Sequence, residues 1–188
     1  MIEIKSCNIC ESQNRRTIED GGDCNVVRCE NCGLVYMDRI MDAGSIPEIY
    51  GKDYFAPWIS EMQNARTKLF QKRWHKAKNL TAKGKILDIG CGLGEFLNFA
   101  KMDGWEAYGI EISAFAANHA SGNYGLNIFE GVLENASFPD DYFDLITIWH
   151  VLEHIPDPAA ALKEVNRIIK PSGKLVVAVP NLNSALYN

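Results

Sequence analysis

The sequence lacks any run of about 18 apolar residues, roughly the length that crosses a bilayer as a helix. No charged-then-apolar leader precedes Cys7, so nothing in the sequence signals secretion. An excess of positive charge is also missing, because the formal net charge is -5, and the chain as a whole therefore has no attraction for nucleic acid. These absences predict a cytoplasmic protein without a membrane partner, and they make nucleic acid an unexpected partner.

Internal repeats and low-complexity segments are absent too. The composition, 47% hydrophobic and 23% charged over 188 residues, is that of a globular chain with a real core. We expect one main domain with a small appendage.

Cysteine is concentrated near the start of the chain. Two pairs, Cys7-x-x-Cys10 and Cys29-x-x-Cys32, supply four thiolates, enough for a closed tetrahedral zinc site of the structural kind. A unit this small cannot be stabilised by burial alone, so a metal would contribute much of its folding free energy. The alternative is that these cysteines are simply buried or joined by disulfides. Cys24 lies outside both pairs.

Two segments with different patterns follow between residues 42 and 80. Residues 42–58 contain Pro47 and Pro57 and are predicted to be irregular. From Met62 to Leu80, apolar and arginine side chains recur every three or four residues, the spacing of an amphipathic helix. Four lysines occupy its other positions, and this basic face is either solvated or a contact for nucleic acid. The lysines are Lys68, Lys72, Lys76 and Lys78.

Strands and helices alternate after Gly84, which predicts an α/β fold with a parallel sheet. The expected strands are 85–89, 107–111, 127–129, 143–149 and 174–179. The expected helices are 95–102, 114–119 and 158–169, with a turn at 170–173. The fourth strand is almost continuously apolar, as expected where both faces are covered.

A glycine-rich loop follows the first of these strands. Gly90, Gly92 and Gly94 let the backbone approach a cofactor closely, and Glu111 ends the second strand, where a carboxylate can accept both hydrogen bonds of a ribose diol. The dinucleotide fingerprint fails, because Glu95 stands where its third glycine belongs. A carboxylate there would also repel a pyrophosphate, so we expect a cofactor without phosphates.

These motifs resemble those of class I S-adenosylmethionine-dependent methyltransferases, in particular the branch that acts on small molecules such as quinones and sugars. The resemblance covers about residues 83–182, and its motifs are LDIGCGLGEFL (87–97), GIEIS (109–113), FPDDYFD (138–144) and WHVLEHIPDP (149–158). The cysteine-rich front end resembles the zinc-binding domain that precedes some C-methyltransferases of nucleotide-linked sugars.

The resemblance implies a Rossmann-like, doubly wound, mainly parallel sheet preceded by a zinc ribbon. It divides the chain into a zinc-ribbon-like domain (1–40), a linker with the amphipathic helix (41–82) and a methyltransferase core (83–188). The family sheet has seven strands, and this chain ends after the fifth, so we expect a C-terminally incomplete core.

The resemblance also implies a set of cofactor contacts. The methionine part would lie against the backbone of 88–94, Glu111 would hold the ribose, Ile112 would pack on the adenine, and 131–134 would flank its other face. Many relatives carry Asp where this chain has Val132. The implied cofactor-binding residues are Asp88, Gly90, Cys91, Gly92, Gly94, Glu111, Ile112, Val132, Leu133, Glu134, Trp149 and His150; Asp88 and Glu111 could instead be purely structural.

His150 is the candidate catalytic base, because imidazole can be neutral near pH 7 and the residue follows the fourth strand. A packing or cofactor-shaping role is the alternative. The predicted function is methyl transfer from S-adenosylmethionine to a small molecule, either a nucleotide-linked sugar or a quinone-like metabolite. Two other classes stay open: a nicotinamide oxidoreductase, disfavoured by Glu95, and a non-catalytic zinc-ribbon adaptor with a residual cofactor-binding domain.

Overall fold

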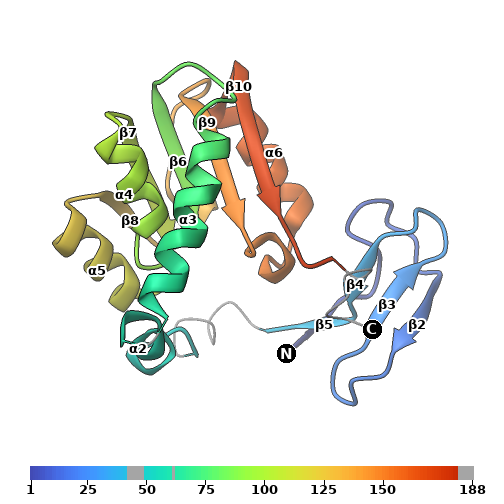
Figure 1. The fold of residues 1–188 in the computed structure, drawn as a ribbon. Helices are drawn as coiled ribbons and strands as arrows, with labels where there is room; N and C mark the ends of the chain where they lie inside the picture. The colour runs from blue at the N-terminus through green and yellow to red at the C-terminus, as the bar shows by residue number, and fades with distance from the viewer. Residues whose placement is uncertain (42–48, 61, 182–188) are drawn as a thin grey trace.

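The computed structural model describes residues 1–41, 49–60 and 62–181, and it shows two units side by side (Figure 1). The smaller unit consists of short strands: β1 (Ile2–Glu3), β2 (Arg15–Glu19), β3 (Val26–Cys29), β4 (Val35–Met37) and β5 (Arg39–Ile40). β1 pairs with β5, and β2, β3 and β4 form an antiparallel sheet in that order.

The larger unit is built on a five-stranded parallel sheet. Its strands are β6 (Lys85–Ile89), β7 (Glu106–Glu111), β8 (Asn127–Glu130), β9 (Phe143–Trp149) and β10 (Ile169–Ala178). Their order across the sheet is β10-β9-β6-β7-β8. The chain runs outward from β6 to β8 and then crosses back to β9, so the topological switch point lies between β6 and β9. The predicted Rossmann-like fold is confirmed.

Helices cover both faces of this sheet: α3 (Gln63–Ala77), α4 (Glu95–Met102) and α5 (Ala114–Tyr124) contribute to one face, and α6 (Pro158–Ile168) covers the other. Successive strand residues point to opposite faces. Ile86 therefore packs under α3 and α4, whereas Leu87 packs under α6, and both are fully buried. Burial on both faces explains why most residues of the central strands β6 and β9 are apolar.

The prediction of irregular structure over 42–58 is wrong where the structure describes that segment. α2 (Lys52–Ser60) is a helix that contains Pro57. It forms because Phe55, only 3% exposed, packs with Leu93 and Ala116 of the larger unit. This tertiary contact outweighs the local cost of a proline inside a helix. Pro47, the other proline of the segment, lies outside the described residues.

The turn predicted at 170–173 is also different in the structure. These residues belong to the first half of β10, which pairs with β9 at Ile169, loses register, and pairs again from Lys174 onward. The irregularity is a bulge within one strand, and it accommodates Pro171 at the edge of the sheet, where a missing N–H group is tolerated. The predicted helix over 114–119 is longer than expected and ends at Tyr124.

Candidate functional site

The main cavity opens beyond the carboxyl ends of β6, β7 and β9, next to the switch point, and has a volume of about 550 Å³. Ligands of open α/β sheets bind at this position. The cavity has three walls: the loop after β6, the ends of β7 and β9 with the segment after β8, and the helices α2 and α3. It therefore collects the sequence motifs that were predicted to act together.

The glycine loop forms the floor of this cavity. Gly90 has a φ of +72°, and a Cβ atom at this position would lie 2.3 Å from Cγ2 of Val151, so only glycine fits. Gly90, Cys91 and Gly92 line the cavity. Gly94 is not among the lining residues; with a φ of +86° it is the N-cap of α4, where a Cβ atom would meet Ala120.

Glu111 stands at the tip of β7 with its side chain buried against the same loop. Its two carboxylate oxygens accept hydrogen bonds from the backbone N–H groups of Gly92 (2.8 Å) and Ser113 (2.9 Å). Burial raises the pKa of Glu111, and these two N–H groups act in the opposite direction. Each oxygen keeps a second acceptor site, so the carboxylate can still hold a diol in the cavity.

Asp88 is the most deeply buried acid of the site. The register of β6 with β9 sets it beside Thr147, whose hydroxyl donates a hydrogen bond of 2.5 Å to Asp88 Oδ1. Burial raises the pKa of Asp88 to about 7, and the negative charge of Glu111 adds to this effect. Asp88 lines the cavity and therefore offers a carboxyl group to a cationic ligand group.

Residues after β7 and β8 form the side wall. Ile112 lines the cavity, as do Val132, Leu133 and Glu134 from the segment after β8. The N–H group of Gly131 donates to the carbonyl of Glu111 (2.9 Å), which ties this segment to the end of β7. The structure thus brings together all predicted cofactor-binding residues except Gly94.

Residues of α2 and α3 complete the cavity and were missed by the sequence analysis. Tyr54 and Trp58 supply an aromatic wall, and Arg66 and Arg73 reach in from α3. Arg66 donates from Nε and Nη2 to the two carboxylate oxygens of Glu95 (3.2 and 3.0 Å), and its Cζ lies 4.0 Å from the ring centroid of Trp58. The pairing offsets the charge of Glu95, so repulsion of a pyrophosphate by Glu95 is weaker than we predicted. The helical spacing placed both arginines on one face of the predicted helix, but the sequence around them did not show that this face lines the cavity.

His150 follows β9 and lies at the cavity wall with about half of its side chain exposed. Its φ of +57° is unusual for a residue other than glycine. Arg73 Nη2 donates to His150 Nε2 (3.1 Å), and Nδ1 lies 3.7 Å from Oε1 of Glu153. The guanidinium of Arg73 also sits over the indole ring of Trp149, 4.6 Å from its centroid.

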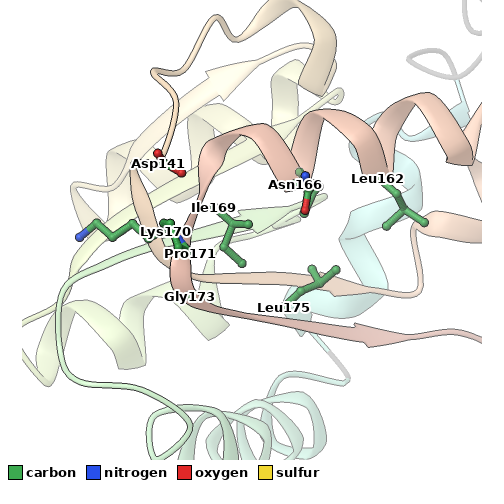
Figure 2. Close-up of a pocket in the computed structure, with 9 residues that line it drawn as sticks. Asp141, Leu162, Asn166, Ile169, Lys170, Pro171, Gly173 and Leu175 are labelled. Carbon is green, nitrogen blue, oxygen red and sulfur yellow. The ribbon is translucent and has the colours of Figure 1, made fainter.

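A second hollow, of about 580 Å³, lies between α6 and the first half of β10 (Figure 2). Asp141, Asn166, Lys170 and Leu175 are among its lining residues. It opens at the amino ends of β9 and β10, away from the glycine loop. Ligands of this fold class bind at the opposite end of the sheet, so we assign the functional site to the first cavity.

The four paired cysteines meet in the smaller unit. All four Sγ atoms of Cys7, Cys10, Cys29 and Cys32 lie within 4.8 Å of one another. Two of these separations, Cys7 to Cys32 and Cys10 to Cys29, are 3.5 Å, far longer than a disulfide bond. They are close to the edge of about 3.8 Å that a tetrahedron of sulfur atoms has around zinc at a Zn–S distance of about 2.3 Å.

Cys24 stays apart from this cluster, and its thiol donates to the carbonyl of Arg39 (3.0 Å). The smaller unit touches the larger one where the Asn8 side chain donates to the carbonyl of Pro156 (3.2 Å), and Pro156 lines the main cavity. Within the described ranges, no helix is long and apolar enough to span a membrane.

Comparison with known proteins gives a consistent set of similarities. A family model described as a methyltransferase domain matches residues 58–187. Among curated proteins, a ubiquinone biosynthesis O-methyltransferase of Coxiella burnetii is 34% identical over 120 residues, covering 58% of this chain and 50% of that protein. A demethylmenaquinone methyltransferase of Staphylococcus saprophyticus is 31% identical over 116 residues, with the same two coverages.

Among solved structures, an S-adenosylmethionine-dependent methyltransferase from Archaeoglobus fulgidus is 30% identical, with a TM-score of 0.57 over 64% of this chain and 56% of that one. The chain spans about half the length of the curated relatives it matches. The family match begins at residue 58, so the smaller unit lies outside it.

Proposed function

The chain belongs to the methyltransferase domain family, and from this premise we propose that it transfers a methyl group from S-adenosylmethionine to a small-molecule acceptor. One observation carries the proposal: a single cavity joins the glycine loop, the carboxylate of Glu111 and the segment after β8. When bound, S-adenosylmethionine supplies an electrophilic methyl group on a sulfonium. The protein's task is then mainly to position the two reactants.

The residues of the cavity fit this cofactor group by group. Glu111 would accept from the ribose hydroxyls, and Ile112 with Leu133 would pack on the adenine. Buried Asp88 and the carbonyls of the glycine loop would receive the ammonium group. Arg73 would receive the carboxylate: it lines the cavity and has no carboxylate within ion-pair distance among the described residues.

The acceptor side of the cavity is aromatic and apolar. Tyr50, Tyr54, Trp58, Leu69 and Phe70 line it, and the rings of Tyr54 and Trp58 lie 4.9 Å apart. Rings recognise planar apolar molecules well. This supports a quinone-like acceptor, which is also what the names of the two curated relatives say of those proteins. A nucleotide-linked sugar would instead present a diphosphate to these walls.

His150 would serve as the base where the acceptor must lose a proton. His150→Ala should lower turnover about 100-fold while leaving cofactor affinity nearly intact, the usual loss for a general base. Steady-state rates with a confirmed acceptor, together with calorimetry, test this. Equal losses of rate and affinity would assign His150 to shaping the cofactor pocket, and a near-normal rate would remove it from the mechanism.

The smaller unit, residues 1–40, would be a zinc ribbon held by Cys7, Cys10, Cys29 and Cys32. The support is that the four sulfur atoms lie within 4.8 Å of one another, with two separations of 3.5 Å that are close to the edge of a tetrahedron around zinc. Four protein ligands close such a site, which makes it structural rather than catalytic.

Calorimetry with S-adenosylhomocysteine and NADH tests the proposed cofactor. We expect S-adenosylhomocysteine to bind and NADH to give no signal. The reverse result would indicate an oxidoreductase. Tight binding of S-adenosylhomocysteine without methyl transfer to any quinone-like phenol or nucleotide-linked sugar would favour the adaptor.

A further inference from the structure

Arg73 and His150 come from distant parts of the chain and meet at the rim of the main cavity. Arginine can only donate hydrogen bonds, so in the contact between Arg73 Nη2 and His150 Nε2 the ring nitrogen must be the acceptor. The imidazole is therefore neutral there, with its hydrogen on Nδ1. That hydrogen faces Glu153, whose Oε1 lies 3.7 Å away.

This arrangement leaves one lone pair on the ring, and Arg73 occupies it. The lone pair on Nε2 is the group that a general base uses to take a proton. The backbone of His150 is anchored to β10, because its N–H group donates to the carbonyl of Ala178 (2.8 Å), and its φ is +57°. The contact with Arg73 therefore blocks the nitrogen that would act as the base.

Within the part of the chain that the structure describes, Arg73 has no carboxylate partner at ion-pair distance. Burial lowers the pKa of Arg73, and the charge of Asp88 only partly offsets this effect. Among the described residues, its guanidinium also lies over the rings of Phe70 and Trp149, at 5.6 and 4.6 Å from the centroids. A carboxylate that entered the cavity would bind this guanidinium better than a neutral imidazole does, because charged pairs form the stronger hydrogen bonds.

We infer that Arg73 caps His150 in the empty protein and that the carboxylate of the bound cofactor draws Arg73 away, which frees His150 Nε2 to act as a base. The inference rests on the proposed function and adds to it an order of events: the base is available only after the cofactor has bound. Arg73 is thus a positioning residue for His150 as well as a cofactor contact.

Two ligands distinguish the effect of the carboxylate from the effect of the rest of the cofactor. S-adenosylhomocysteine carries the amino-acid end, whereas methylthioadenosine fills the adenosine site without it. In protein labelled with ¹⁵N at histidine, NMR should show His150 Nε2 hydrogen-bonded in the empty protein. S-adenosylhomocysteine should move this signal toward that of a nitrogen without a hydrogen bond, and methylthioadenosine should not. The chain has four histidines, so the signal is assigned by its loss in His150→Gln.

Arg73→Met completes the test, with Lys72→Met as the matched control on the exposed face of α3. In Arg73→Met the Nε2 signal should start at the free position and stay there. Affinity for S-adenosylhomocysteine should fall about 10- to 100-fold, the range for a hydrogen bond between charged groups. Methylthioadenosine should bind normally, which shows that the variant is folded; Lys72→Met should match the wild type in every measurement.

The outcomes separate the inference from the proposed function. If both ligands bind and the Nε2 signal does not respond, or responds equally to both, Arg73 is not a cap. If neither ligand binds to the wild type, the proposed cofactor is wrong, and the inference fails with it.

Discussion

Asp88 shows how one residue can serve binding at the expense of stability. A carboxyl group so deeply buried favours its protonated form in the folded protein, and its pKa rises from 3.8 to about 7. The unfolded chain has no such preference. The folded state therefore holds a proton that the unfolded state has lost at the same pH.

The consequence is a stability that falls as the pH rises from about 4 to about 7. Between these values the folded state binds more protons than the unfolded state, so the free energy of unfolding must decrease, by on the order of 4 kcal/mol for Asp88 alone. The pKa of Glu111 is raised as well and acts in the same direction. Urea unfolding from pH 4 to 8 should show this slope, and Asp88→Asn should flatten it. An equally steep slope in Asp88→Asn would mean that other groups cause it.

Glu111 allows the sharpest test of cofactor placement. Glu111→Ala should weaken binding of S-adenosylhomocysteine by about 1.5 to 3 kcal/mol, the range for hydrogen bonds to a charged group. The control is Glu130→Ala at the end of the neighbouring strand β8, an exposed carboxylate that does not line the cavity. Calorimetry on both folded variants decides the matter. Equal affinities would mean that the ribose lies elsewhere.

At the scale of elements, the pair Arg66–Glu95 fastens α3 to α4. Both side chains are only 11% exposed and meet through two hydrogen bonds. Glu95→Gln should leave the charge of Arg66 without its partner and lower the free energy of unfolding by roughly 3 kcal/mol. Urea denaturation measures the loss.

The pair Lys78–Asp103 serves as the control, because it joins the end of α3 to the end of α4 with side chains 33% and 42% exposed. Lys78→Met should cost much less, since solvent already screens this pair. A double variant, Arg66→Met with Glu95→Leu, should recover much of the stability that Glu95→Gln loses. Losses of equal size in the two pairs would contradict the argument from burial.

The elements that the sequence predicted well are those whose own pattern decides their structure. β6, α4 and β9 have the predicted bounds, because the strands are mostly apolar and a glycine marks the start of the helix. α2 could not be predicted, since its formation depends on Phe55 reaching Leu93, a contact between distant segments. The bulge of β10 depends likewise on its partner strand β9.

Some residues of the candidate site could likewise be predicted from the sequence, and others could not. The glycine loop and Glu111 could be found because they follow strands whose carboxyl ends share one edge of the sheet. Arg73 could not be assigned to the site, because it lies 77 residues from His150 and only the packing of α3 brings them together. Gly94 does not line the cavity and begins α4, and spacing alone does not distinguish a glycine that faces a ligand from one that begins a helix.

At the scale of the whole molecule, we expect the two units to unfold separately. If the four thiolates hold zinc, denatured protein should release about one zinc per chain. Cys10→Ser should unfold residues 1–40 while the larger unit keeps its affinity for S-adenosylhomocysteine. Cys24→Ser is the matched control, since Cys24 lies outside the cluster and should not affect the zinc content. Protein purified without chelator that contains no zinc would contradict this proposal.

The distribution of tryptophan has a practical consequence for such experiments. All four tryptophans belong to the larger unit: Trp74 and Trp105 are buried in its core, and Trp58 and Trp149 line the cavity, each beneath an arginine. Tryptophan fluorescence therefore reports on the larger unit alone, because the first 40 residues contain no tryptophan. Because the departure of Arg73 would remove a cation from the face of Trp149, the tryptophan emission of the unlabelled protein should change when a ligand binds in the cavity.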